Sequence, residues 1–366
     1  MTSSPFFTPS SPLHNDPDIT SSQKRPRQEQ VKEAKGRVDY VPGSIPVEVS
    51  FAYRQIYPPK NIANPIPPLI FVKKIMDTLF GSISIYEIAK WTTVPPEERY
   101  ELTPVRQTPP QYFAVKRFLK DNIDRKISAA GRPTQEDPKT ALEIEMFLKN
   151  HRHPNVIELI YCLETVNDIF AVYPFLTPDL LDYIISEEHL EIQHKKLLFL
   201  CMCKAVFHCH NLGICHRDVS LENFLLSEDK EQCLLIDFGL AVRMKPKENQ
   251  HGWQPIYSSV GKTSYMSPEV FNRGNTIPYD GVANDIWCLG VCLYSMIFRS
   301  PPWRSTSMAD EHFKKLIMEN KLKNLLEKKN IAPEIIDLQC KMLTLDPDER
   351  ISLSEILMHP WFQSEQ

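Results

Sequence analysis

The sequence predicts an α+β protein with two lobes, a small N-terminal lobe made mainly of strands and a larger C-terminal lobe made mainly of helices. Two patterns and the chain length indicate this organisation. SISIYEIAKW alternates apolar and polar residues as a half-buried strand does, whereas HKKLLFLCMCKAVFHCHNLG and VANDIWCLGVCLYSMIF have the length and apolar content of helices. The 366 residues, 42% of them hydrophobic, suffice for two lobes.

Residues 1–67 form an arm rich in Ser, Thr and Pro. Few aliphatic residues occur in it before Val41, so it cannot bury enough apolar area to offset the cost of ordering, and we predict that it is disordered. The basic cluster QKRPRQ and the prolines after Ser4, Thr8 and Ser11 leave two interpretations open. The arm is either a solvated tail or a nuclear-import signal with proline-directed phosphorylation sites.

Residues 68–176 are predicted to form the small lobe and residues 177–362 the large lobe. YFAVKRF and DIFAVYPFL predict further strands of the small lobe, and TALEIEMFLKN predicts its single helix. Two stretches, near residues 92–111 and 127–138, carry prolines at spacings that neither a helix nor a strand would tolerate. We expect both to loop out, as unstructured insertions or as docking surfaces.

Charge and cysteine content restrict the partners and the compartment. A net charge of −4 gives no general attraction to nucleic acid or acidic membranes, so we expect neither as a partner. The nine cysteines include no CxxC pair at zinc-ligand spacing and predict reduced core thiols. No secretory leader is recognisable, and no segment approaches the roughly 18 apolar residues of a membrane span. These features predict a cytoplasmic or nuclear protein.

Three short motifs follow one another in a specific order. FAVKRF contains Lys116, HRDVSLEN contains Asp218 and Asn223, and IDFGLAV contains Asp237. Each motif alone is weakly specific. Their order and spacing, within a region from about residue 70 to residue 362, resemble the eukaryotic protein kinases of the serine/threonine type. The resemblance implies the bilobal protein kinase fold.

The resemblance also implies a chemistry. Phosphoryl transfer from ATP depends mainly on positioning and on neutralising charge. By resemblance, Asp218 accepts the proton of the attacking hydroxyl, and Asn223 and Asp237 hold Mg²⁺ against the phosphates. Lys116 binds the α- and β-phosphates. The expected substrates are proteins.

Kinases pair the strand lysine with a glutamate of the small-lobe helix, and this helix offers Glu143 and Glu145. Helices of the family carry an apolar residue four positions after that glutamate, on the same face. Phe147 meets this condition for Glu143, whereas Lys149 does not meet it for Glu145. We therefore predict that Glu143 is the partner of Lys116.

The nucleotide base is expected at the segment after DIFAVY, where Tyr173 would be a bulky gatekeeper. By resemblance, Pro174 offers its carbonyl and Leu176 its N–H to the adenine. Asp179 is placed to meet a ribose hydroxyl, and Leu225 forms the floor beneath the base.

Activation-segment residues predict regulation and support of the site. Arg217 would contact a phosphate on this segment, with acceptors expected at Ser258, Ser259 or Thr263, which implies an upstream activating kinase. GKTSYMSPEV resembles the end of the segment, and Glu269 in it would pair with Arg350 in DPDERIS. Asp285 in NDIWCLG would brace the catalytic loop.

Three positions depart from the family pattern. Kinases have a GxGxxG loop that lets backbone N–H groups approach the phosphates, but DTLFGSISIYEIAKW supplies only Gly81. Ser220 replaces the lysine that neutralises γ-phosphate charge, and Lys262 stands where threonine is usual, with Thr263 as a substitute from the next position. We expect a weakened phosphate site.

The predicted function is that of an ATP- and Mg²⁺-dependent serine/threonine protein kinase acting as a monomer. Its motifs resemble a divergent, protist-like branch related to the calcium/calmodulin-dependent kinases, although no EF-hand loop is present and we expect no direct Ca²⁺ control. Two alternatives stay open. Gly81 and Ser220 are compatible with a catalytically weak or inactive nucleotide-binding pseudokinase scaffold, and residues 1–66 with the insertions are compatible with an interaction protein.

Overall fold

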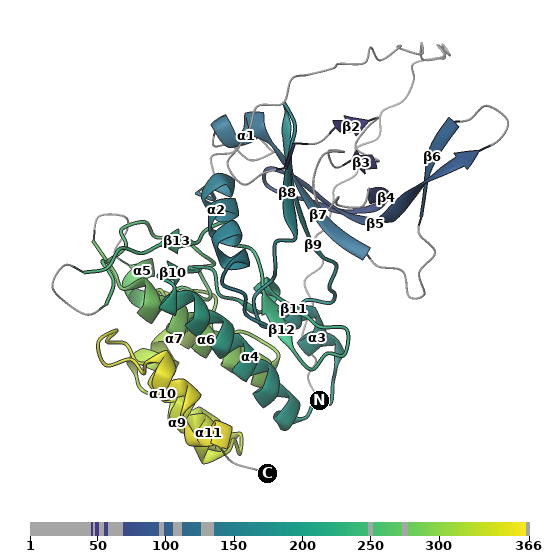
Figure 1. Ribbon diagram of the computed structural model, residues 1–366. Helices are drawn as coiled ribbons and strands as arrows, with labels where there is room; N and C mark the ends of the chain where they lie inside the picture. Colours follow the sequence, from purple (N-terminus) through teal and green to yellow (C-terminus); the bar gives the residue numbers. More distant parts are fainter. Residues whose placement is uncertain are drawn as a thin grey trace, which may run out of the picture. The chain divides into compact units, whose positions relative to one another are not determined.

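The computed structural model describes residues 45–46, 48–50, 55–57, 69–94, 99–104, 112–125, 135–247, 252–272 and 277–363. The described residues form a small lobe built on a sheet and a larger lobe built on helices (Figure 1). The predicted α+β, two-lobed organisation is therefore confirmed.

The small lobe is built on a nine-stranded sheet. Its central strands pair antiparallel in the order β8, β9, β7, β5 and β4, while β1 adds to one end and β3 and β2 to the other. The strands are β1 (Ile45–Pro46), β2 (Glu48–Ser50), β3 (Gln55–Tyr57), β4 (Leu69–Asp77), β5 (Gly81–Val94), β6 (Arg99–Pro104), β7 (Tyr112–Leu119), β8 (Tyr161–Glu164) and β9 (Asp168–Pro174).

Strands β1, β2 and β3 fall within the range 1–67 that was predicted to be disordered, and that prediction is wrong for these short segments. Each gains backbone hydrogen bonds by pairing along the sheet, so it needs no apolar core of its own. Residues 1–44 of the predicted arm lie outside the described residues.

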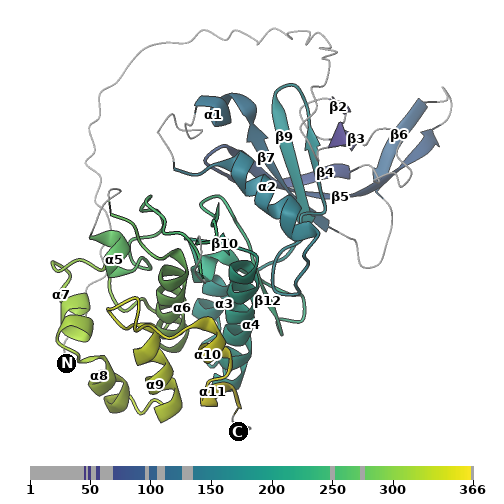
Figure 2. The same ribbon diagram turned by 60° about the vertical axis from the view of Figure 1, so that its left-hand side comes forward.

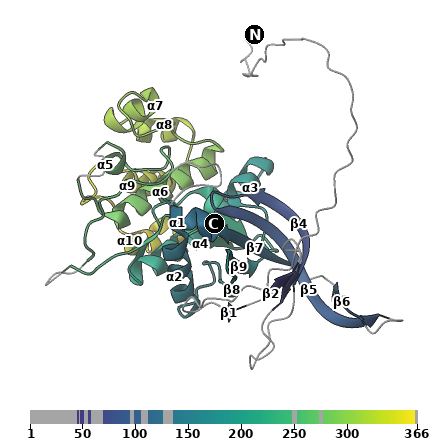
Figure 3. The same cartoon turned by 90° about the horizontal axis from the view of Figure 1, so that it is seen from above.

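The first predicted insertion, near residues 92–111, contains a strand pair. β5 continues to Val94 and pairs with β6, forming a two-stranded extension beyond the main sheet (Figure 3). The prolines did not prevent this because Pro104 is the last residue of β6, where it interrupts no further pairing. Residues 95–98 and 105–111 lie outside the described residues, as do residues 127–134 of the second insertion.

Two helices accompany the sheet, α1 (Lys120–Arg125) and α2 (Pro138–Lys149), and α2 lies beside it (Figure 2). The Asp137 carboxylate accepts hydrogen bonds from the first-turn backbone N–H groups of α2, and Pro138 occupies the first helical position. Leu142 packs with apolar residues of the sheet, whereas Ile144 and Leu148 pack in the core of the large lobe. Helix α2 thus links the two cores.

The large lobe surrounds two long helices, α4 and α6 (Figure 1). An 18-residue window in α6 is apolar enough to cross a membrane, but 83% of it is buried inside the protein, as in a core helix. The elements are α3 (Leu180–Ser186), α4 (Ile192–Asn211), β10 (Ile214–Cys215), η1 (Leu221–Asn223), β11 (Phe224–Leu226), β12 (Cys233–Leu235), β13 (Val242–Arg243), α5 (Pro268–Phe271), α6 (Gly281–Phe298), α7 (Glu311–Phe313), η3 (Lys314–Met318), α8 (Leu322–Lys328), α9 (Pro333–Met342), α10 (Leu353–Leu357) and α11 (Pro360–Gln363).

A buried ion pair joins the start of α5 to the segment before α10. The Arg350 guanidinium donates to both carboxylate oxygens of Glu269, at 2.7 and 3.1 Å, as predicted. It also donates to the carbonyls of Ala283 and Thr344, at 2.8 and 3.0 Å. Because the guanidinium is fully buried, removing either partner would leave an uncompensated charge inside the lobe.

We expect Arg350→Met to lower the free energy of unfolding by about 3–5 kcal/mol, because Glu269 would stay buried without its cation. Urea denaturation measures the change. Arg125→Met is the matched control, since Arg125 pairs with Asp121 on the surface and such pairs contribute at most about 1 kcal/mol. Equal losses in the two variants would contradict this account.

Candidate active site

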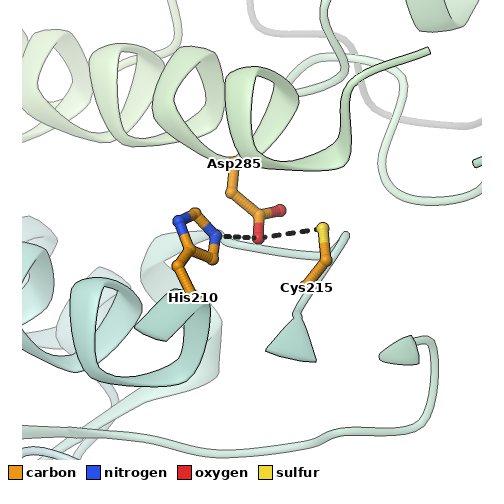
Figure 4. A group of neighbouring side chains, drawn as sticks. All are labelled: His210, Cys215 and Asp285. Atoms are coloured by element: carbon orange, nitrogen blue, oxygen red, sulfur yellow. Dashed lines mark hydrogen bonds and ion pairs between the residues drawn. The ribbon is translucent and has the colours of Figure 1, made fainter. Parts of the chain in front are cut away.

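One carboxylate from the core of the large lobe fixes the backbone that carries the predicted proton acceptor. Asp285 in α6 accepts the N–H of His216 and the N–H of Arg217, both at 2.9 Å. Its Oδ2 also contacts His210 Nε2 at 3.0 Å and Cys215 Sγ at 3.3 Å (Figure 4). Burial alone would raise the pKa of Asp285, but these partners hold the pKa below its usual range.

His210, Cys215 and Asp285 have the donor types of a metal site, and their ligand atoms lie within 4.8 Å of one another. Both Asp285 oxygens, however, already accept backbone N–H groups. We therefore interpret the group as a brace of the catalytic loop, as the sequence predicted.

Asp218 and Asn223 lie together in this loop. The Asn223 side-chain N–H₂ donates to Asp218 Oδ2 at 2.8 Å and to the Asp218 carbonyl at 2.7 Å. Burial raises the pKa of Asp218, while the nearby Lys262 ammonium opposes the rise. The backbone carbonyl of Asn223 accepts the N–H of Ile236, which places the residue before Asp237 beside the loop.

Lys116 and Asp237 form an ion pair between the two lobes. Lys116 lies in β7, and its Nζ is 3.2 Å from Asp237 Oδ1. The Lys116 charge lowers the pKa of Asp237, so the carboxylate is ionised. Asp237 Oδ1 also accepts the N–H of Gly239, which orients the side chain. The structure thus brings together four of the predicted site residues, Lys116, Asp218, Asn223 and Asp237.

The prediction of Glu143 as the partner of Lys116 is wrong in this structure. Glu143 is exposed, whereas Glu145, on the opposite side of α2, is 6% exposed and interacts electrostatically with Lys116. The Tyr173 hydroxyl donates to Glu145 Oε2 at 2.5 Å. Burial raises the pKa of Glu145 to about 7, although Tyr173 and Lys116 oppose the rise.

The apolar residue that the sequence argument required is present, but it serves another contact. Phe147 is half-buried, and the Arg243 guanidinium lies 4.2 Å from the centroid of its ring. Lys149, on the face of Glu145, donates to the backbone carbonyl of Ile160. A lysine thus occupies the half-buried position where the family pattern led us to expect an apolar side chain.

Three of the predicted base-binding residues lie at the end of β9 or soon after it, and the fourth, Leu225, lies in β11. Pro174 ends β9, and Leu176 is half-buried two residues later. Asp179 accepts the N–H of Asp182 and caps α3, and it forms a β-bridge with Leu225. The structure therefore brings Asp179 and Leu225 together, and their contacts with nucleotide stay predictions.

The structure explains in a different way why a glycine stands at position 81, through the packing of β5 against β7. A Cβ at Gly81 would lie 1.9 Å from the Arg117 carbonyl, so only glycine allows β5 to approach β7 this closely. Gly81 N–H donates to Thr78 Oγ1 at 3.1 Å, and Thr78 N–H donates to the Gly81 carbonyl at 3.0 Å. The Gly81 amide is thus used within the turn between β4 and β5, and the predicted nucleotide contact of Gly81 is untested.

An acidic side chain from the second predicted insertion also faces the site. Glu136 Oε2 lies 3.4 Å from the position of a Cβ at Gly239, and the Asp137 N–H donates to the Gly239 carbonyl at 3.0 Å. Burial and the charge of Asp237 raise the pKa of Glu136. Sequence reasoning missed Glu136 because no spacing rule connects this segment to the Asp-Phe-Gly motif.

Among the three predicted phosphate acceptors, Ser258 contacts Arg217 through its hydroxyl. Arg217 Nη1 donates to Ser258 Oγ at 2.5 Å, and Ser258 is exposed. The Ser259 hydroxyl donates to the Val270 carbonyl at 3.0 Å. Thr263 is exposed, and Lys262, not Thr263, reaches Asp218 and Ser220. The suggested substitution by Thr263 is therefore wrong.

Comparison with known proteins is consistent with this site. The family described as "Protein kinase domain" matches residues 104–362, more than half of the chain. Serine/threonine-protein kinase cds1 of Schizosaccharomyces pombe is 32% identical over 69% of this chain and 53% of its own length. Calcium-dependent protein kinase 14 of Arabidopsis thaliana is 32% identical over 69% of this chain and 45% of its own length.

A probable serine/threonine-protein kinase of Dictyostelium discoideum is 34% identical over 58% of this chain and 24% of its own length. This chain thus spans from about a quarter to about half of the length of these relatives. A calcium-dependent kinase among them gives only weak support to the expected relation with the calcium/calmodulin-dependent group.

The pKa of Glu145 is about 7 in the folded protein, against 4.5 for an exposed glutamate, which predicts a pH-dependent stability. The folded protein retains this proton up to about pH 7, whereas the unfolded chain loses it near pH 4.5. Protonated Glu145 therefore contributes its full stabilisation below pH 4.5, and this stabilisation is lost as the pH rises to about 7. Relative to Glu145→Gln, the wild type should lose about 3 kcal/mol of unfolding free energy across this window.

Urea denaturation at a series of pH values measures this difference. Glu143→Gln, which alters the exposed side of the same helix, is the matched control. The same pH dependence in both variants would show that Glu145 does not hold the proton.

Proposed function

Because this chain belongs to the protein kinase family, we propose that it transfers the γ-phosphoryl group of ATP to serine and threonine hydroxyls of proteins. One observation carries the proposal. The Asp218–Asn223 pair lies beside the Lys116–Asp237 ion pair, so a proton acceptor, oxygen donors and a cation occur in one place. Phosphoryl transfer needs these groups in position.

The residues fit Mg²⁺, which prefers oxygen ligands. Asn223 turns its side-chain N–H₂ group toward Asp218, which leaves its side-chain oxygen available as a metal ligand. Asp237 presents an ionised carboxylate. A bound Mg²⁺ would neutralise phosphate charge. We propose that Lys116, now 3.2 Å from Asp237, contributes a further positive charge to the nucleotide phosphates.

Asp218 supplies the proton acceptor in this proposal. The substrate hydroxyl oxygen forms a bond to the γ-phosphorus while its proton passes to the Asp218 carboxylate. The bond between the γ-phosphorus and the β–γ bridging oxygen breaks, and ADP leaves with that electron pair. The hydrogen bonds from Asn223 hold the carboxylate in one orientation for this step.

An inactive pseudokinase scaffold is the second candidate, and Gly81 and Ser220 are the observations that favour it. The complete set of Lys116, Asp218, Asn223 and Asp237 argues for the enzyme.

The nine cysteines, all within the described residues, form no disulfide bonds, which supports a reducing compartment, cytoplasmic or nuclear. We propose that the protein acts as a monomer on protein substrates.

We propose regulation by an upstream kinase at Ser258. A phosphate on this residue would carry a charge of about −1.5 to −2 toward Arg217, which precedes Asp218 and already contacts the Ser258 hydroxyl. The charge-assisted contact would order the activation segment against the catalytic loop.

Asp218→Asn should abolish incorporation of labelled phosphate from MgATP into serine- and threonine-containing substrates, by at least about 10²-fold, because the amide cannot accept the proton. Asp348→Asn is the matched control, since Asp348 is exposed and distant in sequence from the catalytic motifs. Binding of MgATP by a wild type that phosphorylates nothing, after treatment with an activating kinase, would favour the scaffold.

Ser258→Ala should lose any activation produced by an upstream kinase, whereas Ser259→Ala should retain it, because the Ser258 hydroxyl accepts a hydrogen bond from Arg217 while the Ser259 hydroxyl donates to the Val270 carbonyl. The measurement is the rate of substrate phosphorylation before and after treatment, together with mass spectrometry of the modified site. Activation that survives in Ser258→Ala would place the regulatory phosphate elsewhere.

A further inference from the structure

Two departures from the kinase pattern lie against each other in the active site. Ser220 stands in the catalytic loop where a lysine is usual, and Lys262 stands in the activation segment where a threonine is usual. The Lys262 Nζ donates to Ser220 Oγ at 2.6 Å, across 42 positions of sequence. The chain has therefore kept one hydroxyl and one ammonium group at this point but has exchanged the segments that carry them.

The ammonium group lies next to the predicted proton acceptor. Lys262 Nζ is 3.8 Å from Asp218 Oδ2 and 3.5 Å from Glu222 Oε1. Ser220 is fully buried, so its hydroxyl needs a partner inside the protein, and Lys262 provides it. The Lys262 side chain is 36% exposed, which leaves the ammonium partly open beside Asp218.

The backbone conformation at Gly261 allows the activation segment to pass close to the catalytic loop just before Lys262. Gly261 has φ +112°, a conformation that favours glycine, and a Cβ there would lie 2.6 Å from the Arg217 carbonyl. The activation segment therefore touches the catalytic loop one residue before Lys262 and one residue before Asp218. Any other residue at position 261 would clash with the Arg217 carbonyl, so this close approach requires glycine.

We propose that Lys262 supplies to the transferred phosphoryl group the positive charge that relatives obtain from the catalytic-loop lysine, an inference that rests on the proposed kinase function. As the substrate oxygen bonds to phosphorus and ADP departs with the electrons of the broken bond, negative charge collects on the phosphoryl oxygens. Lys262 faces that charge and keeps its own protons, while Asp218 takes the hydroxyl proton. Ser220 holds the ammonium in place.

The alternative is that Lys262 only neutralises Glu222, whose Oε2 also accepts a hydrogen bond from Tyr265 at 3.3 Å. In that case Lys262 would be structural. An exchange of residues separates the two roles, because Ser220→Lys with Lys262→Thr restores an ammonium and a hydroxyl in the segments where relatives carry them.

The experiment compares the wild type, Lys262→Thr, and the exchanged double variant. We expect Lys262→Thr to lower kcat by ~10²-fold with a smaller effect on KM for ATP, as loss of one preorganised donor does. The double variant should recover most of the lost kcat. Lys323→Thr, at an exposed lysine of α8, is the matched control and should keep the wild-type rate.

A binding measurement adds a readout apart from turnover. Calorimetry would compare the affinity for MgADP alone with the affinity for MgADP plus aluminium fluoride and acceptor peptide, a mimic of the transferring phosphoryl group. Lys262→Thr should bind MgADP as the wild type does but lose the gain that the fluoride produces. The double variant should regain it.

Several outcomes would overturn the role of Lys262: an unchanged kcat in Lys262→Thr, a double variant no more active than the single one, or an unchanged fluoride-dependent gain. If the wild type transfers no phosphate, the proposed kinase function fails. The fluoride-dependent affinity would then still decide whether Lys262 faces the phosphoryl position, so the two failures are distinguishable.

Discussion

The hydrogen bonds between the Asp285 carboxylate and the backbone of the catalytic loop are the constraint on which the rest of the site depends. Its two oxygens accept the consecutive N–H groups of His216 and Arg217, which restricts the position of the next residue, Asp218. Arg217 adopts φ 65°, an uncommon backbone conformation that this double contact stabilises. A buried helix of the large lobe therefore determines where the reactive carboxylate lies.

The other functional groups of the site come from different elements of the fold. Asn223 follows in the same loop, Asp237 comes with the hairpin of β11 and β12, and Lys116 comes from the middle of the small-lobe sheet. Helix α2 contributes apolar residues to both lobes, so movement of Glu145 and movement of the small lobe are linked. The site is thus assembled from elements that lie far apart in the sequence.

The sequence predicted the two lobes and four groups of the site because short motifs carry them at fixed spacing. It could not decide between Glu143 and Glu145, because the choice depends on which side chain is buried and on a hydrogen bond from the Tyr173 hydroxyl. Tyr173 lies in β9, 28 residues after Glu145 in the sequence. It missed the pairing of β5 with β6 because prolines at strand ends look the same in sequence as prolines in loops. Lys262 appeared as a defect, because its partner lies 42 residues away.

The position of Lys262 makes one catalytic requirement conditional. A lysine inside the catalytic loop would stay in place whatever the state of the rest of the large lobe. A lysine in the activation segment is present only while that segment is folded against the loop, through the close passage at Gly261. Unfolding of this segment would withdraw the Lys262 ammonium from Asp218, so the site would lose a positive charge without any change in the catalytic loop itself.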